Sequence, residues 1–138
     1  MRIDPKQVTL NELLRGRLFR IPDYQRAYSW ERKQRDDFFT DISEITQSDH
    51  DHFMATFVCL AREKHTIITD DFQIVDIVDG QQRLTTIIIL LNTIKLHLEN
   101  ECKDGSAVIS DLHSILCKSD DNSLILLQTN HDNSNIFV

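Results

Sequence analysis

The sequence has little glycine or proline and no long hydrophobic run. Only 3 Gly and 2 Pro occur among its 138 residues, which excludes collagen-like, linker-like and low-complexity chains. The longest unbroken apolar run is Ile87–Leu91, far shorter than the ~20 residues that span a bilayer. The N-terminal residues Met-Arg-Ile-Asp-Pro lack the apolar stretch of a secretory signal. We therefore expect a cytoplasmic protein with no membrane partner.

Recognisable metal-binding patterns are also missing. The three cysteines, Cys59, Cys102 and Cys117, stand far apart and form no C-x-x-C pair, which excludes a zinc ribbon or a redox motif. We expect them to be reduced and mostly buried. His50-Asp51-His52 offers three ligand types, but no partner stands at a workable spacing, so we favour a structural role for this segment.

The length and composition are those of one soluble globular domain. Apolar residues make up 41% and charged residues 27% of the chain, which is ordinary for such a domain. The chain ends at Val138 directly after Asn135-Ile136-Phe137, without a glycine cap or a charged tail. We therefore expect residues 1–138 to form a single domain that is incomplete at its C-terminal end.

The charge is unevenly distributed along the chain. Residues 1–35 carry nine Lys and Arg against four Asp and Glu, a net +5, and the rest carries six against eighteen, within a total of −7. Such a basic front end could attract a phosphate while the whole chain repels polyanions. A solvated basic helix face explains the same pattern, and on charge alone we favour that explanation.

Hydrophobic periodicity predicts a mixture of helices and strands. The first expected elements are a helix opened by a capping box at Thr9 and Glu12 and ending near Gly16, a strand over 18–21 and a helix over 31–47. A buried strand over 53–60 should follow, and then two strands over 66–69 and 73–78 that are joined by a turn at Asp70-Asp71. The last expected elements are a long helix after Gly80, a helix over 108–116 and a short segment over 124–127.

The long helix is the strongest prediction from the pattern. One face carries Leu84, Ile87, Ile88, Leu91, Ile94 and Leu98, and Ile89 and Leu90 widen it. A face of that breadth is typical of a helix buried on more than one side. We expect Ile88, Leu91 and Ile94 to be largely buried, and Leu91→Ala to cost about 2–5 kcal/mol.

The junction Asp79-Gly80-Gln81-Gln82-Arg83, where a strand meets this helix, is a candidate anion site. A helix start carries a partial positive charge, and glycine lets a ligand approach the backbone. Gln81 and Gln82 add amide donors, and Arg83 adds a planar guanidinium. Asp79 would cap the helix or hold a metal ion beside phosphates. The alternative is an ordinary exposed first turn, because Asp-Gly opens many helices.

Asp76 is not an acid/base partner of Asp79, because residues three apart on a strand point to opposite faces.

A second dense segment, residues 21–30, combines aromatic and basic side chains on a loop. Arg26 could reach a phosphate, and an aromatic residue such as Tyr24 could stack on a base. For Tyr28 and Trp30 we favour a role in attaching the loop to the core.

Three segments together resemble one bacterial family. Ile21–Trp30, His52–Val58 and Ile77–Thr86 are similar to the N-terminal domain of GmrSD-type restriction endonucleases, with Ala55 in place of a frequent glycine. The resemblance implies an α+β, ParB/sulfiredoxin-like fold, in which a small mixed sheet packs with helices and a long helix follows the DGQQR turn. It also implies a domain that binds or hydrolyses a nucleoside triphosphate in phage defence and regulates an HNH nuclease domain. Asn130–Asn133 has HNH-like residue types without the required hairpin-and-helix context.

We therefore interpret the chain as a nucleotide-binding sensor domain. Gly80, Gln81, Gln82 and Arg83 would hold the phosphates, Asp79 would orient the turn or hold Mg²⁺, Arg26 would add a phosphate contact, and Tyr24 or Gln25 would lie near the sugar or base. Asp79 and Arg83 are the candidates for hydrolysis. Two alternatives stay open: a truncated protein-interaction fragment, and a DNA-binding module without hydrolysis that uses Arg15, Arg17, Arg20, Arg32, Lys33 and Arg35. The oligomeric state is also open.

Overall fold

The computed structural model describes residues 3–22, 28–45, 55–67, 70–101, 107–117 and 127–129. The elements, in chain order, are α1 (Leu10–Leu14), β1 (Arg17–Ile21), α2 (Arg32–Ile45), β2 (Val58–Ile67), β3 (Asp70–Asp79), α3 (Gln81–Glu101), α4 (Ala107–Leu116) and β4 (Leu127–Thr129). This arrangement confirms the predicted α+β class, with a mixed sheet and a long helix after the DGQQR turn. No helix in the described part of the chain is long and apolar enough to cross a membrane.

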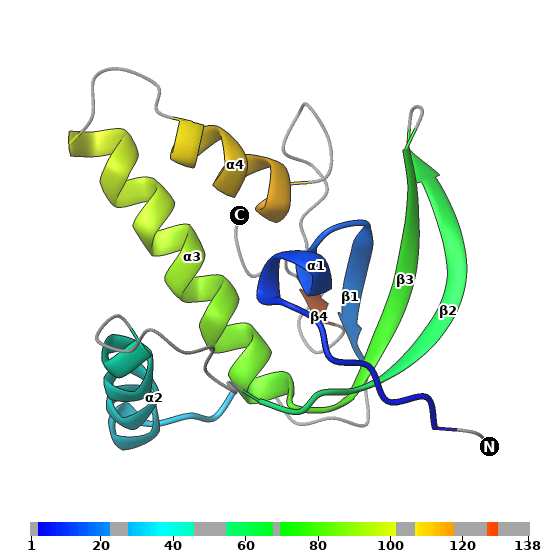
Figure 1. Cartoon of the computed structure of the whole chain (residues 1–138), viewed down its shortest axis with the longest axis horizontal. Helices are drawn as coiled ribbons and strands as arrows, with labels where there is room; N and C mark the ends of the chain where they lie inside the picture. Colours follow the sequence, from blue (N-terminus) through cyan, green and yellow to red (C-terminus); the bar gives the residue numbers. More distant parts are fainter. Residues whose placement is uncertain are drawn as a thin grey trace.

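The sheet is mixed and has the strand order β2-β3-β1-β4 (Figure 1). β2 and β3 form an antiparallel hairpin, whereas β1 pairs in parallel with both β3 and β4. The β1–β3 register places Phe19 opposite Val75 and Arg20 opposite Asp76. Since β1 and β3 are parallel neighbours, their carboxyl ends lie at the same edge of the sheet. The start of α3 follows directly from that edge.

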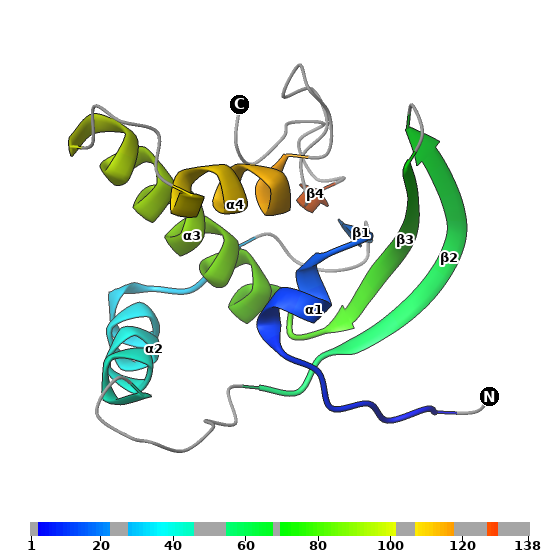
Figure 2. The ribbon, with the colours of Figure 1, turned by 45° about the horizontal axis from the view of Figure 1, so that its top comes forward.

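One face of the sheet is covered by helices, and the hydrophobic core lies between them. The views agree that α1 and α4 lie on the same side of the sheet as α3, while α2 lies apart below α3 (Figures 1 and 2). Strand side chains alternate in direction, so β1 and β3 each send every second residue into this core. The buried cluster is Leu14, Phe19, Ile21, Val75, Ile77, Leu84, Ile88, Ile115 and Leu116.

The start of the chain folds as its residue pattern predicts. Thr9 Oγ1 accepts a hydrogen bond from the Glu12 backbone N–H at 3.2 Å, and Glu12 Oε2 accepts one from the Thr9 N–H at 2.9 Å. These two bonds satisfy otherwise unpaired donors and form the predicted capping box. Gly16 then takes a positive φ of 69°, and β1 begins one residue later.

The hairpin differs from the expectation in three ways. β2 begins at Val58 and not at residue 53, and Val58, Cys59 and Leu60 are exposed, so the predictions of a buried strand and a buried Cys59 were wrong. Asp70 and Asp71 belong to β3, opposite Ile67 and Thr66, and are not the turn. The physical reason is that β2 is the outer strand of the sheet, where apolar residues are not enclosed.

α3 is most deeply buried over its first two turns. Five consecutive residues, Leu84–Ile88, are buried, which confirms a helix covered on more than one side there. Farther along, Leu91 is partly buried against the core, and Ile94 is 40% exposed, so the expected burial of Ile94 was wrong. The helix runs past the sheet, and α4 covers only part of the extension (Figure 1).

We predict that two isoleucines of α3 will respond differently to truncation. Ile88 is completely buried, so Ile88→Ala should lower the free energy of unfolding by about 2–5 kcal/mol. Ile94→Ala should cost less than about 1 kcal/mol, because 40% of the surface of that residue is already exposed to water. Urea unfolding of both variants measures the difference. Equal losses would mean that the C-terminal half of α3 is enclosed in solution.

Candidate functional site

The candidate site is the turn from β3 into α3. β3 ends at Asp79, Gly80 has a positive φ of 95°, and the Leu84 N–H donates to the Gly80 carbonyl at 3.0 Å. That bond is the first of the helix, so Gly80 occupies the N-cap position. We had expected Asp79 there. It lies one residue earlier, as the last residue of the strand, because the hairpin pairing continues to Val58 opposite Asp79.

Gly80 is required by the packing of the chain itself. A Cβ built on Gly80 would lie 2.6 Å from Phe57 Cδ1 and 3.4 Å from the Thr56 carbonyl oxygen, and the positive φ disfavours any other residue. Phe57 in turn packs against the hydrophobic core. The close approach that glycine permits here is therefore made by a phenylalanine ring of the same chain.

The segment Tyr28–Trp30 is fastened to the first turn of α3. Gln82 Oε1 accepts from the Ser29 N–H at 2.8 Å, and the Tyr28 hydroxyl lies 3.0 Å from Thr86 Oγ1. The predicted attachment of this loop to the body of the protein is confirmed for Tyr28. The Gln82 amide oxygen thus serves the fold, a role that the sequence did not indicate.

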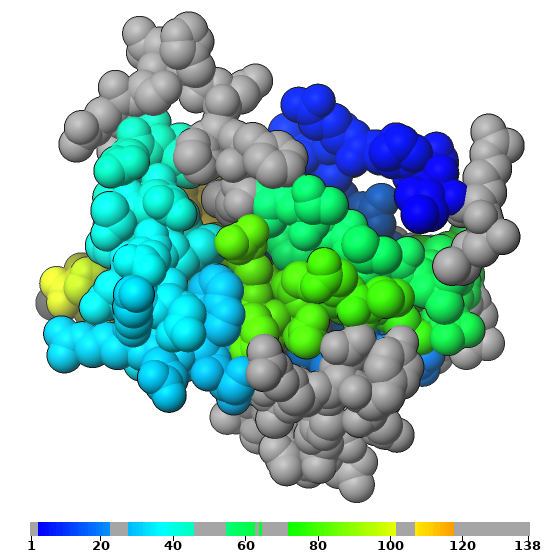
Figure 3. All heavy atoms as spheres, turned by 90° about the horizontal axis from the view of Figure 1, so that it is seen from below, coloured from blue at the N-terminus to red at the C-terminus, as the bar shows by residue number. Residues whose placement is uncertain are grey.

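Trp30 extends this connection to α2. Its ring packs edge to face on Phe38, with 5.8 Å between ring centroids, and its carbonyl accepts from Arg35 Nη1 at 3.0 Å. The attaching role that we favoured for Trp30 is confirmed. Seen from below, residues of α2 in cyan lie against green residues of β3 and the start of α3 (Figure 3). The first two turns of α3 therefore hold the segment that leads into α2.

Arg83 has an unusual environment for a residue in the first turn of a helix. The residue is partly buried, and its Nε atom is buried without a hydrogen-bond partner among the described residues. Leaving a buried donor unpaired costs about 1–3 kcal/mol, and more for a charged group. Native structures contain few such atoms, and a bound ligand is one of the explanations for them. Arg83 therefore does not belong to an ordinary exposed first turn, which was the alternative interpretation of this junction.

Asp79 is the acidic residue of the junction. Its side chain is exposed, and the described residues contain no group of three or more His, Cys, Asp or Glu placed to hold a metal ion. A single carboxylate still suits Mg²⁺ when substrate phosphates and water complete the octahedron, as in many phosphate-transfer sites. Asp79 could therefore supply one ligand to a divalent cation whose other ligands are phosphate oxygens and water.

Two of the remaining predicted site residues are within the described structure, and three are not. Gln81 and Gln82 are partly buried in the first turn of α3. Tyr24, Gln25 and Arg26 lie outside the described residues, so their proposed contacts with phosphate, sugar and base remain predictions. The structure thus brings the DGQQR residues together at one helix start.

The sequence analysis missed a charged cluster across the sheet. Asp76, with only 4% of its side chain exposed, accepts from Arg20 on β1 and from Arg62 on β2. Hydrogen bonds from Arg20, and more weakly from Arg62, lower the pKa of the Asp76 carboxyl against the opposing effect of burial. The signal was present in the strand Ile74-Val75-Asp76-Ile77-Val78, where a single acid interrupts an apolar run and needs a basic partner.

The fold and the junction together define an α+β domain built around a strand–glycine turn–helix unit with a basic first turn. The sequence profile of the GmrSD restriction endonuclease, N-terminal domain, matches residues 9–137 of the chain. The chain therefore belongs to this family, as the three motifs predicted, and is part of a restriction endonuclease. No curated protein matches the chain significantly.

We predict that the two positive-φ glycines will differ when each is changed to alanine. Gly16→Ala should cost about 1–2 kcal/mol for the backbone conformation alone, because nothing lies within 4 Å of its added Cβ. Gly80→Ala should cost about 1–3 kcal/mol more, because its Cβ would overlap Phe57. Thermal and urea unfolding measure both. Equal costs would show that Phe57 does not close over Gly80.

We predict that Asp76→Asn will destabilise the protein in a pH-dependent way. The folded-state pKa of Asp76 lies below the unfolded value, so its contribution is present above the unfolded pKa of about 3.9 and is lost as the pH falls through the folded pKa. The variant should lose about 2 kcal/mol at pH 7, less than for a fully buried pair because both arginines are half exposed. Urea unfolding from pH 7 to pH 3 should show the difference shrinking below pH 4. A difference independent of pH would contradict an ionised Asp76.

Proposed function

We propose that this domain binds a nucleoside triphosphate with Mg²⁺ at the start of α3 and acts as the sensor of a phage-defence restriction endonuclease. The observation that carries the proposal is the buried, unpaired Nε of Arg83. A phosphate oxygen is a suitable acceptor for it, because guanidinium and phosphate groups match in charge and geometry.

The surroundings of Arg83 support an anionic ligand. α3 has 21 residues, and the aligned peptide dipoles of a long helix place a partial positive charge at its N-terminal end. The first turn has no acidic residue to oppose that charge. A phosphate group bound here would therefore interact with both the helix dipole and the Arg83 guanidinium.

Asp79 supplies the carboxylate of the proposed site. It directly precedes the N-cap Gly80 and is exposed, and so it is available to Mg²⁺ that is held mainly by phosphate oxygens and water. When bound, the metal would neutralise charge on the phosphates. For hydrolysis of the bound nucleotide, Asp79 and Arg83 are the residues we propose.

The junction also offers a way for the ligand to affect the rest of the protein. Gln82 and Thr86 hold the Tyr28–Ser29 segment, and Trp30 connects this segment to α2. A ligand at Arg83 would bind beside these bonds. We propose that α2 reports occupancy to the companion nuclease domain that the family membership suggests.

The DNA-binding alternative is less well supported by the geometry. The arginines that it invokes make local contacts: Arg17 bonds the Glu12 and Leu13 carbonyls, Arg15 bonds Asn11, and Arg32 pairs with Asp36. These contacts give three of the invoked residues a role in the fold. Such residues give at most weak, salt-sensitive attraction to DNA.

We predict that Arg83→Met will separate ligand binding from stability. At 100 times Kd, a Mg²⁺–nucleoside triphosphate should add about 2.7 kcal/mol to the parent, a rise in Tm of roughly 10 °C for a domain of this size. Arg83→Met should lose most of this rise. Its unliganded Tm should be unchanged or higher, because methionine keeps the apolar stem and removes a buried unpaired donor.

Lys95→Met is the matched control. Lys95 lies on the same helix, its side chain is largely buried, and it pairs with Glu99, so the change removes the same charge away from the junction. The control should keep the full nucleotide-dependent rise in Tm. A normal rise in Arg83→Met, measured with ATP and GTP in the full-length protein, would contradict the proposed site.

A further inference from the structure

A second group of basic side chains lies on the sheet and, with one acidic residue, spans three neighbouring strands. Arg20 comes from β1, Asp76 from β3 and Arg62 from β2. Arg20 stands directly opposite Asp76 in the parallel register. Arg62 lies within the irregularity between Ala61 and Lys64 that interrupts the hairpin register. The bulge places a long basic side chain within reach of the neighbouring strand.

Asp76 holds the two arginines side by side. Its Oδ1 accepts from Arg20 Nε at 2.7 Å, and its Oδ2 accepts from Arg20 Nη2 at 3.2 Å. The same Oδ2 also accepts from Arg62 Nε at 2.7 Å. Both guanidinium groups are therefore within hydrogen-bond distance of one oxygen, and the buried carboxylate fixes their positions.

The cluster places two guanidinium groups on one carboxylate. One bidentate arginine already pairs with the Asp76 carboxylate, so Arg62 adds a second positive charge beside the first, and like charges at this separation repel. The side chains of Arg20 and Arg62 are 38% and 49% exposed. The two Nη groups of Arg62 make no hydrogen bond to the described residues.

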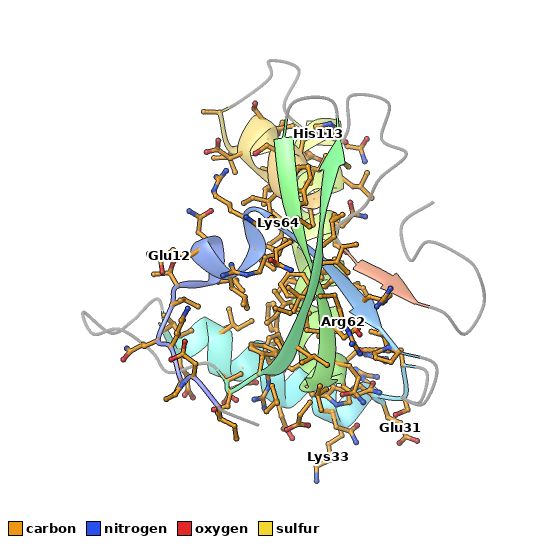
Figure 4. The ribbon with its side chains drawn as sticks, turned by 90° about the vertical axis from the view of Figure 1, so that its right-hand side faces the viewer. Glu12, Glu31, Lys33, Arg62, Lys64 and His113 are labelled. Carbon is orange, nitrogen blue, oxygen red and sulfur yellow. The ribbon has the colours of Figure 1, made fainter. Side chains whose placement is uncertain are left out.

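The cluster is separate from the start of α3. Val75 and Ile77 point into the core beneath the helices, so Asp76 between them points to the opposite face of the sheet. Figure 4 shows Arg62 toward β1 and β4, whereas Lys64 of the same strand lies toward α1. Asp76 precedes Asp79 by three residues, about 10 Å along an extended strand. A ligand at Arg62 thus meets a surface that the nucleotide proposal does not use.

We propose that Arg20 and Arg62, positioned by Asp76, form a phosphate-binding site on this face of the sheet. A phosphate would lie against the Arg62 guanidinium and would accept hydrogen bonds from its exposed Nη groups. The phosphate can belong to a free phosphate compound or to the backbone of DNA. This inference does not depend on nucleotide binding at Arg83.

The test compares Arg62→Gln with Arg15→Gln in the full-length protein. Arg15 is a matched control, because it is an exposed arginine with one side-chain hydrogen bond at the C-cap of α1, the helix on the other face of the sheet. Two probes distinguish the sources of phosphate. Inorganic pyrophosphate is followed by the rise in Tm, and a fluorescent DNA duplex is followed by anisotropy between 50 and 200 mM NaCl.

The proposal predicts a loss in at least one arm for Arg62→Gln that clearly exceeds any loss for Arg15→Gln. If the ligand is a free phosphate compound, the pyrophosphate-dependent rise in Tm becomes smaller in Arg62→Gln, and it disappears when Arg62→Gln is made in the Arg83→Met background, which lacks the other proposed phosphate site. If it is DNA, the slope of log K against log salt falls by about 0.9, the value of one lost phosphate contact. Arg62→Lys, which keeps the charge and loses the planar fork, should lie between parent and Arg62→Gln, and it replaces that variant should Arg62→Gln not fold.

Two results would overturn the proposal. In one, Arg62→Gln shows the same rise in Tm with pyrophosphate and the same salt dependence of DNA binding as the parent. The cluster would then serve only to hold the strands together. In the other, Arg15→Gln shows the same loss as Arg62→Gln. The loss would then follow from the change in net charge of the protein and not from a site at Arg62. Repeating the comparison in the Arg83→Met background distinguishes the two proposed sites, because Arg62→Gln should still have its effect there.

Discussion

The contact between Gly80 and the Phe57 ring is the constraint on which the rest of the structure depends. The positive φ of Gly80 turns the chain from β3 into α3, and the absence of a Cβ lets Phe57 close over the turn. This arrangement fixes where α3 begins, and so it places Leu84 and Ile88 in the core. It also sets the position of Gln82 and Thr86, which hold the Tyr28–Ser29 segment.

Residues of this turn have structural roles and a proposed ligand-binding role side by side. Gly80 and Gln82 make contacts that serve the packing of the chain. Arg83, in contrast, carries a buried donor without a partner among the described residues. A fold selected for stability alone has little reason to keep such a group, because an apolar residue of similar shape avoids its cost. This donor is the observation that favours the proposed anion at the helix start.

Local patterns in the sequence predicted most of the fold, and long-range contacts account for what they missed. The capping box at Thr9 and the long helix after Gly80 depend on neighbours in the chain, and both were confirmed. The exposure of Ile94 depends on where α4 and the sheet end, which periodicity does not encode. The Arg20–Asp76–Arg62 cluster joins residues up to 56 positions apart, so only strand order and register reveal it. For the candidate site, the sequence located the junction but not the contacts that Gln82 and Gly80 make within the chain.

The most direct test of the central claim is the ¹H–¹⁵N NMR signal of the Arg83 Nε–H group, assigned by comparison with Arg83→Met and followed during titration with Mg²⁺–nucleoside triphosphate. A buried Nε–H should exchange slowly enough with water to be observed without ligand. The account predicts that this signal shifts downfield with saturation as a phosphate oxygen accepts its hydrogen bond. A signal that stays in place while the nucleotide demonstrably binds would show that the ligand is held elsewhere and would contradict the account.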